Sequence, residues 1–197
     1  MAVPAAVVPP NLLQDPGFLF LAPIGSSIPT NTVAGSVFTD AWDVAWLPLG
    51  ATQDGTQFSY TTNVQPVYAA EFYDPIKYAS TDRSGNVAFS LLNLGLSNYL
   101  RALNGGVAAL TPTSGTGATA LYDVSPTAVG GEVRAMLGWE SLDHTMRLVA
   151  YQVLCSGTIT SAFQKGPSQA VIPCTFNMET TSAGLIFKMS GAGASRA

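Results

Sequence analysis

The sequence predicts a mainly β protein: an antiparallel β-sandwich or β-barrel with one flanking α-helix, an extended N-terminal arm and long loops. Apolar and polar residues alternate in several short segments, such as residues 86–91, and a period of two is typical of strands with one buried face. A helical period is clear in one segment only, residues 96–103. The 19 glycines and 13 prolines divide the chain into short elements joined by turns.

The two ends of the chain are expected to differ from the rest. Residues 1–16, MAVPAAVVPPNLLQDP, contain four prolines, which fix φ and remove backbone donors, so they are predicted to form an extended arm. Residues 190–197, SGAGASRA, are predicted to be a flexible tail. Residues 17–189 between them are expected to form a single β domain.

About nine short strands are expected between these ends. A further strand around Val37 is possible from the sequence. The segment 105–118 is rich in glycine and uncharged, and it is expected to be a long loop. In residues 132–140, Val133 and Trp139 alternate with Glu132 and Glu140, which predicts a strand with one dry and one wet face. The expected strands are residues 17–22, 56–60, 67–73, 86–91, 119–124, 132–140, 146–154, 170–178 and 185–189, with an apolar run at 44–50.

The single helix is predicted from apolar residues at positions i, i+3, i+4 and i+7. Asn93 is the expected N-cap, and Asn104-Gly105-Gly106 is the expected left-handed stop. The helix and the neighbouring strands should together form the core. The predicted core residues are Val87, Phe89, Leu91, Leu96, Leu100, Leu103 and Trp139.

Charge is scarce and unevenly distributed. Charged residues make up 10% of the chain, against about 25% in ordinary globular proteins, while 47% of residues are hydrophobic. This composition favours a protein that covers much of its surface with copies of itself, although a low-charge monomer remains the alternative. Residues 1–76 contain six acids and no base, giving −6, and residues 77–197 contain six acids and eight bases, giving +2. Without a basic patch, the chain is a poor candidate for a nucleic-acid binder.

No residue pattern predicts catalysis. His144 follows Asp143 in an expected turn, and there is no G-x-S-x-G segment to supply an activated serine. Asp40 and Asp43 form a carboxylate pair of a kind that is common on solvated loops. Gly115-Thr116-Gly117 lacks the lysine of a phosphate-binding loop. The sequence therefore predicts neither an enzyme nor a catalytic or cofactor-binding residue, and no cofactor.

The cysteines and tryptophans are expected to be structural. Cys155 and Cys174 do not have the spacing of a metal site, so no metal is expected, and the two are predicted to be free and buried, with a disulfide as the alternative. Trp42, Trp46 and Trp139 are the residue types of a sugar-binding groove, but tryptophans more often fill a core or an interface.

Three segments carry a resemblance to a known family. They are LPLGATQDGTQFSY, VQPVYAAEFYDPIKY and GNVAFSLLNLGLSNYLRALNGG. A turn of the form L-G-x-T-x-x-G precedes a strand, an acidic E-x-x-x-P segment follows at Glu71 to Pro75, and a further strand runs into one helix. In this order the features resemble the major tail tube protein of long-tailed, siphovirus-type bacteriophages, over about a third of the chain.

The resemblance implies a structural virion protein. Six subunits would join their sheets into a ring, and stacked rings would form the tail tube through which phage DNA is ejected without sequence-specific binding. The implied partners are further copies of the chain and the tape measure, tail tip and tail terminator proteins, with no membrane. Expected ring or lumen contacts are Glu71, Asp74, Glu132 and Glu140, and expected contacts between rings are Pro4, Pro9, Pro10, Thr111 and Thr113.

Two other functions stay open at this stage. One is a β-sandwich binding module, such as a capsid decoration protein or a glycan-binding tail domain, and the other is the related ring protein of a bacterial contractile injection system. The N-terminus lacks the basic residues of a secretory signal. We therefore expect synthesis in a cytoplasm, and the resemblance implies assembly in the host cytoplasm and a final location in the virion tail.

Overall fold

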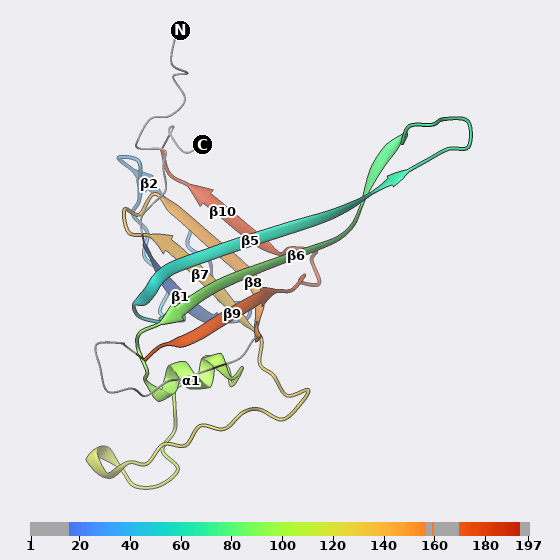
Figure 1. Cartoon of the computed structure of the whole chain (residues 1–197). Helices are drawn as coiled ribbons and strands as arrows, with labels where there is room; N and C mark the ends of the chain where they lie inside the picture. Colours follow the sequence, from blue (N-terminus) through green and yellow to red (C-terminus); the bar gives the residue numbers. More distant parts are fainter. Residues whose placement is uncertain (1–15, 157–158, 160–169, 194–197) are drawn as a thin grey trace.

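A large antiparallel sheet of eight strands forms the body of the protein in a computed structural model, which describes residues 16–156, 159 and 170–193 (Figure 1). A two-stranded sheet and one short α-helix, α1, complete it. The elements are β1 Gly17–Pro23, β2 Val33–Ala34, β3 Val37–Phe38, β4 Leu47–Pro48, β5 Thr52–Val67, β6 Lys77–Leu91, α1 Leu96–Ala102, the 3-10 turn Gly117–Thr119, β7 Ala135–Ser141, β8 Met146–Ser156, β9 Ile172–Met178 and β10 Phe187–Gly191.

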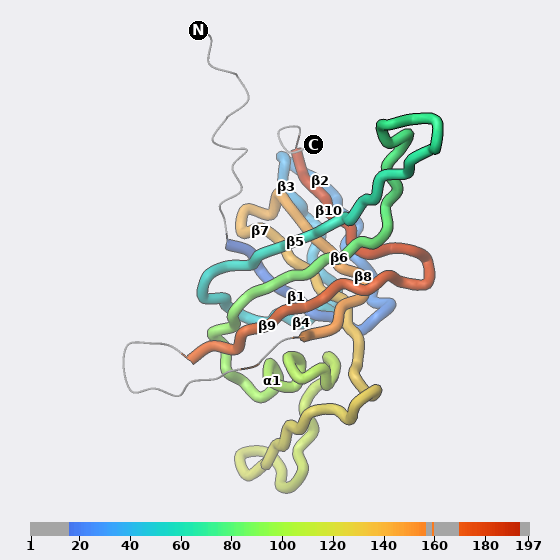
Figure 2. Tube along the Cα trace, turned by 45° about the vertical axis from the view of Figure 1, so that its right-hand side comes forward, coloured from blue at the N-terminus to red at the C-terminus, as the bar shows by residue number. Residues whose placement is uncertain are grey.

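The large sheet bends around the core without closing into a barrel (Figure 2). Its strand order is β4-β1-β7-β8-β9-β6-β5, and β10 also pairs with β8. β8 is the branch point, since one of its edges pairs first with β10, at Met146–Ala150, and then with β9, from Val153 onward. The predicted mainly β class is confirmed, with an open, curved sheet in place of two separate sheets.

The main core lies inside this bend. Leu19 and Leu21 of β1 face Val87, Phe89 and Leu91 of β6 and residues of β7, β8 and β9 across the core. The prediction that Val87, Phe89 and Leu91 are core residues is confirmed, because they are 1%, 6% and 1% exposed. Trp139 is partly buried and packs against the same cluster.

The outer face of β1, β7 and β8 carries a second apolar cluster. Ala22, Trp46, Met136 and Val149 are buried there, beneath the segment 24–46. Gly138 allows this close packing, since a Cβ at its position would lie 2.5 Å from the ring of Trp42. β7 is therefore buried on both faces, and the expectation of a wet face is wrong for this strand, which begins only at Ala135; before it, Val133, expected on the dry face, is 47% exposed.

The helix buries a different face from the one predicted. It starts after Gly95, and Asn93 accepts a hydrogen bond from the Gly95 N–H instead of capping the helix. Asn98 and Ala102 are its buried residues, whereas Leu96 is 45% exposed and Leu100 and Leu103 are half-buried. Leu96 is thus not a core residue, because the helix packs its polar Asn98 inward, where the side chain donates to the carbonyls of Leu49 and Asn93.

Several element boundaries also differ from the expected ones. Residues 67–73 are not a strand: β5 ends at Val67, and the chain turns there. Residues 119–124 form only an isolated bridge between Ser114 and Leu121. The last strand continues to Gly191, past the expected start of the tail. The expected β7–β8 hairpin is confirmed by its register, with Trp139 opposite Leu148.

Candidate interaction surface

The most unusual feature of the fold is the length of the β5–β6 hairpin, which projects beyond the body (Figure 1). β5 has 16 residues and β6 has 15. β6 pairs with β9 only along residues Asn86 to Leu91. Its outer half, from Lys77 to about Gly85, pairs with β5 alone, and β5 is the last strand of the sheet, so its other edge has no strand partner among the described residues.

Burial changes sharply along the hairpin. Near the body, residues 85–91 of β6 alternate between buried and half-buried, as expected for a strand that covers a core. Beyond this point, residues 61–66 of β5 and 80–84 of β6 are all exposed. The same two strands therefore form part of the sheet at one end and a free two-stranded ribbon at the other.

The register shows that one face of this ribbon is a continuation of the core face. Phe58 lies opposite the buried Val87, and the next pairs on the same face are Tyr60 with Gly85, Thr62 with Arg83, Val64 with Ser80, and Pro66 with Tyr78, so one polar pair interrupts the apolar side chains. Tyr60, Val64 and Tyr78 are 37%, 55% and 67% exposed. We call this face, defined by Tyr60, Val64, Pro66 and Tyr78, the apolar hairpin face.

The opposite face of the ribbon is polar. Its cross-strand pairs are Thr61 with Ser84, Asn63 with Asp82, and Gln65 with Ala79. A β-bulge at Thr81 shifts the register between Asn63 and Val64, and the Thr81 hydroxyl donates to the Asn63 carbonyl at 3.2 Å. Because a bulge increases local twist, it turns the outer ribbon relative to the body.

The connection between the two strands adds more exposed apolar side chains. The Phe72 N–H donates to the Ala69 carbonyl, and the Ile76 N–H donates to the Val67 carbonyl, which closes the loop. Large apolar residues on this connection are exposed; they are Tyr68, Phe72, Tyr73 and Ile76. Glu71 and Asp74 lie among them and are exposed as well.

The four acids expected to make ring or lumen contacts do not come together. Glu71 and Asp74 are on the hairpin connection, and among the described residues neither forms an ion pair. Glu132 precedes β7 and accepts a hydrogen bond from the Gly130 N–H, and this bond together with that of its own N–H lowers the pKa of its carboxyl. Glu140 is 3% exposed, so its assignment to the ring or lumen surface is wrong.

Glu140 belongs instead to a buried charge cluster on the outer face of β7 and β8. Arg147, which is also 3% exposed, contacts Glu140 Oε1 at 3.1 Å through Nη2 and Asp40 Oδ2 at 3.1 Å through Nη1. Its guanidinium also donates to the Asp40 carbonyl and lies 4.7 Å from the centre of the Phe38 ring. Arg147 thereby holds the segment 31–46 against the sheet.

The residues that raised the question of catalysis are engaged in structural contacts. His144 Nδ1 lies 2.7 Å from Glu140 Oε1, while the buried Ser141 hydroxyl donates to Asp143, not to the histidine. Asp43 accepts a hydrogen bond from the Ala45 N–H, whereas Asp40 forms an ion pair with Arg147, so the two carboxylates do not act as a pair. No dyad or triad geometry results from these contacts in the described part of the chain.

The other predicted residues have mixed outcomes. Cys155 and Cys174 are free and buried, as predicted, and their mutual hydrogen bond together with burial raises the pKa of Cys174 far above its usual value. Thr111 and Thr113 are exposed on the loop that follows α1. Pro4, Pro9 and Pro10 lie outside the described residues.

The tryptophans do not form one exposed platform. Trp46 is 4% exposed, and Trp42 stacks on Phe20 and meets Trp46 edge-to-face, with ring centres 4.7 Å apart in both pairs. Trp139 lies on β7 and packs on the opposite side of the sheet, against the main core. Side-chain stacking within the fold thus accounts for Trp42 and Trp46, and nothing in their placement favours sugar binding.

Sequence reasoning missed the apolar hairpin face. Residues 61–66 read as a polar stretch, and no strand was expected there. The sequence does contain the residues of this surface, Val64, Pro66 and Tyr78, but they can be recognised as one surface only when the cross-strand register is known.

Within the described ranges, none of the helices has the length and hydropathy of a membrane span, and no three His, Cys, Asp or Glu side chains are grouped to bind a metal. Comparisons with protein-family models and with curated proteins found no match to this chain.

Proposed function

We propose that this protein is a self-assembling structural subunit, and that it forms stacked hexameric rings as the tail tube of a long-tailed bacteriophage. The observation that carries the proposal is the apolar hairpin face, which continues the core face of the sheet beyond the end of its own core. The surface supports self-assembly in general, and the sequence resemblance supplies the particular assembly.

The physical argument starts from the marginal stability of an isolated ribbon. A two-stranded hairpin is marginally stable in water unless a third strand or a packed face supports it. Tyr60 packs edge-on against Phe187 of β10, but beyond it the outer ribbon has neither within the described residues, and Val64 and Tyr78 are exposed on one face of it. Exposed large apolar side chains gathered on one face and flanked by polar ones are typical of an interaction site, so the ribbon supports a role in contact with another chain.

The free edge of β5 supports the same conclusion. An edge strand presents unpaired N–H and C=O groups that can pair with another chain, and natural proteins usually protect long edges with charge, proline or a covering element. β5 contains a single charged residue, Asp54, and its only proline, Pro66, is near its end. Joining sheets between subunits would satisfy these groups, and head-to-tail contacts of this type close into rings.

The location of the resembling segments adds to the proposal. The first segment leads into β5, the second covers the end of β5 and the connection, and the third is the inner half of β6 followed by α1. The part of the sequence that resembles tail tube proteins is therefore the part that forms the projecting hairpin and its anchor. The scarcity of charge fits a tube that DNA crosses without binding, since phosphate contacts need Lys and Arg.

Electron microscopy and light scattering on the full chain would test the proposal. The variant Pro66→Lys with Tyr78→Glu changes one directly opposed pair on the apolar hairpin face, and the opposite charges can still attract across the strands. The matched control is Gln65→Lys with Ala79→Glu, the neighbouring opposed pair on the polar face. We expect rings or tubes with sixfold symmetry from the parent and the control, and folded monomers from the variant.

Two results would count against the proposal. A parent protein that stays monomeric at every concentration, with or without preformed tubes as seeds, would remove the self-assembly claim. Normal tubes from the Pro66→Lys, Tyr78→Glu variant would show that the apolar hairpin face is not the contact. Rings that do not stack and that have another symmetry would retain self-assembly but exclude the tail tube.

A further inference from the structure

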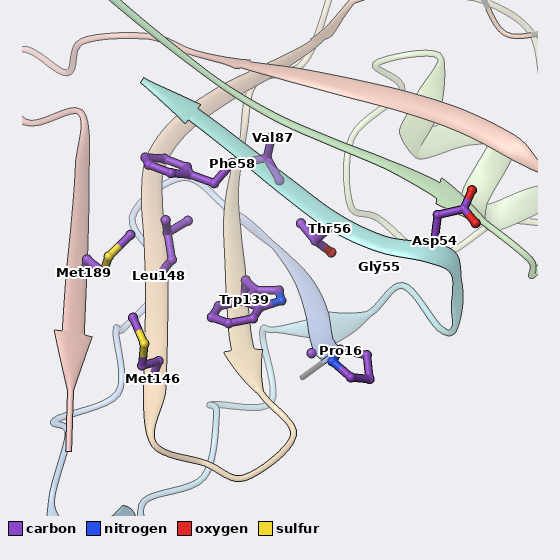
Figure 3. Close-up of a pocket in the computed structure, with 11 residues that line it drawn as sticks. Pro16, Asp54, Gly55, Thr56, Phe58, Val87, Trp139, Met146, Leu148 and Met189 are labelled. Atoms are coloured by element: carbon purple, nitrogen blue, oxygen red, sulfur yellow. The ribbon is translucent and has the colours of Figure 1, made fainter. Parts of the chain in front are cut away.

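A cavity of about 650 Å³ opens between β5 and the strands β7, β8 and β10 (Figure 3). Its apolar lining consists of Phe58, Val87, Trp139, Met146, Leu148 and Met189. At about 30 Å³ per water, this volume equals roughly twenty waters, which is too large for a packing defect. The cavity lies between the start of the edge strand β5 and the wall formed by β7, β8 and β10.

Two polar atoms in the wall of this cavity are buried without partners. They are Trp139 Nε1 and Thr56 Oγ1, and neither has a hydrogen-bond partner among the described residues. A buried donor of this kind is costly and is normally satisfied. A suitable occupant must therefore offer apolar side chains for the lining and hydrogen-bonding groups for these two atoms, which is what a short apolar peptide segment provides.

The described chain begins at the rim of the same cavity. Pro16 and Gly17 line it, and Gly17 passes so close to Trp139 that a Cβ would lie 2.2 Å from the unpartnered Nε1. The fifteen residues before Pro16 include the apolar pair Leu12 and Leu13. At about 3.3–3.6 Å per extended residue, Leu13 reaches about 10 Å and Leu12 about 13 Å from Pro16, enough to enter the cavity.

We propose that this cavity is the docking site of the chain's own residues 11–14, with Leu12 and Leu13 as the apolar anchors. A segment tethered by two or three residues has a millimolar effective concentration at the site, so it outcompetes the same segment of another copy. Met146 and Met189 are unbranched, polarisable side chains that adapt their shape to such an occupant. This inference concerns contacts within one chain and does not rest on the proposed function.

Disulfide cross-linking in the full chain would test the docking. Leu13→Cys is combined with Met189→Cys, which places the second thiol inside the cavity, in a background carrying Cys155→Ala and Cys174→Ala. The matched control combines Leu13→Cys with Leu142→Cys, since Leu142 is exposed and its N–H donates to the Pro16 carbonyl, yet it does not line the cavity. A disulfide such as oxidised glutathione serves as oxidant: it accepts two electrons as two protein thiols lose their protons and form one S–S bond, and it leaves as two thiols.

A docked arm is expected to cross-link within the chain to position 189 at least tenfold faster than to position 142. Equal rates to both positions would indicate an undocked arm, and cross-links between chains would indicate docking into a second copy; both results overturn the proposal. A second measurement avoids the cysteine background: Leu12→Asp with Leu13→Asp should increase acrylamide quenching of tryptophan fluorescence, while Val7→Asp with Val8→Asp should not. Unchanged quenching in the first variant, with its circular dichroism intact, also contradicts the docking.

Discussion

Arg147 illustrates how a protein with few charges can bury one of them. The guanidinium forms ion pairs with two carboxylates, donates a further hydrogen bond to the Asp40 carbonyl and lies over the Phe38 ring. Most of its N–H donors therefore have partners. Such a cluster adds little to stability compared with apolar packing, but removing one member leaves uncompensated buried charge. We therefore expect the cluster to be sensitive to single substitutions.

Two arginines of different burial give a direct comparison. Arg147→Ala should lower the free energy of unfolding by about 3–5 kcal/mol, because Glu140 and Asp40 lose their cation. Arg134→Ala, which removes the 3.2 Å pair with Glu179 between side chains that are 37% and 32% exposed, should cost about 0–1 kcal/mol. Urea denaturation of both variants measures this difference, and equal losses would show that the buried cluster does not have the assigned role.

Asp40 should make stability depend on pH. Burial of its carboxyl raises the pKa, but the hydrogen bond from the Asn31 N–H and the charge of Arg147 outweigh burial and lower it below the usual value. A lowered folded-state pKa means that ionised Asp40 stabilises the fold above its usual pKa of about 3.9 and that this stabilisation is lost as the pH falls through the lowered value. Asp40→Asn should thus be less stable than the parent at pH 7, with the difference shrinking below about pH 4. Denaturant melts across this range check it, and a constant difference would contradict the assignment.

At the scale of elements, the end of α1 is fixed by one residue with two functions. Asn104 has a φ of 58°, and the Gly105 N–H to Leu100 carbonyl and Asn104 N–H to Arg101 carbonyl bonds close the helix in a Schellman motif. The Asn104 side chain also donates to the Cys155 carbonyl at 2.7 Å and accepts from the Cys155 N–H at 2.8 Å. In this way a helix stop that was predicted from the sequence also attaches the helix to β8.

Substitutions at Asn104 can separate these two functions. Asn104→Gly keeps the left-handed backbone and loses the two hydrogen bonds to Cys155, each worth about 0.5–1.5 kcal/mol, so a loss of about 1–3 kcal/mol is expected. Asn104→Ala loses these bonds and adds the strain of a left-handed β-carbon, about 1 kcal/mol more. Thermal or urea melts of the pair should therefore rank Gly above Ala. The reverse order would show that backbone conformation does not limit stability here.

Elements with local partners could be predicted from the sequence, and those with distant partners could not. The β7–β8 hairpin was predicted because its strands are adjacent and a tight turn lies between an alternating segment and a mostly apolar one. Residues 67–73 alternate just as clearly, but a strand needs a partner, and pairing with β6 stops at Val67 opposite Lys77, where the chain reverses. Alternation reports local amphipathicity, and only pairing turns it into a strand.

The same limit applies to the candidate site and to the inner face of the helix. Glu140 alternates with Trp139 and so appeared exposed, but the segment 31–46, which is distant in sequence, covers that face of β7. Asn98 breaks the apolar helix pattern, yet it points inward because the Leu49 carbonyl needs a donor there. Neither arrangement leaves a local signal, since both depend on which segment packs on top.

For the whole molecule, the proposed assembly has a defined salt dependence. If the apolar hairpin face drives association, then association should persist in about 1 M NaCl, where the screening length is roughly 3 Å, and should strengthen in sulfate. Sedimentation of the full chain across both salts measures this. Dissociation by NaCl would instead indicate that contacts between the −6 and +2 segments of neighbouring copies are the driving force.

The order of strands in the sheet also determines which strands can pair first while the chain is being synthesised. β1 can pair with β4 soon after synthesis, but its other neighbour, β7, joins Gly17 to Ser141 and is made only after more than a hundred further residues, about 6–25 s at 5–20 residues per second. The β5–β6 hairpin closes between Val67 and Lys77 and needs only microseconds once its strands emerge. The apolar residues of the hairpin are therefore made well before the sheet that supports its inner half is complete. Crowding of nascent chains in that interval would favour aggregation over folding, because unpaired strand edges and exposed apolar residues are then present together.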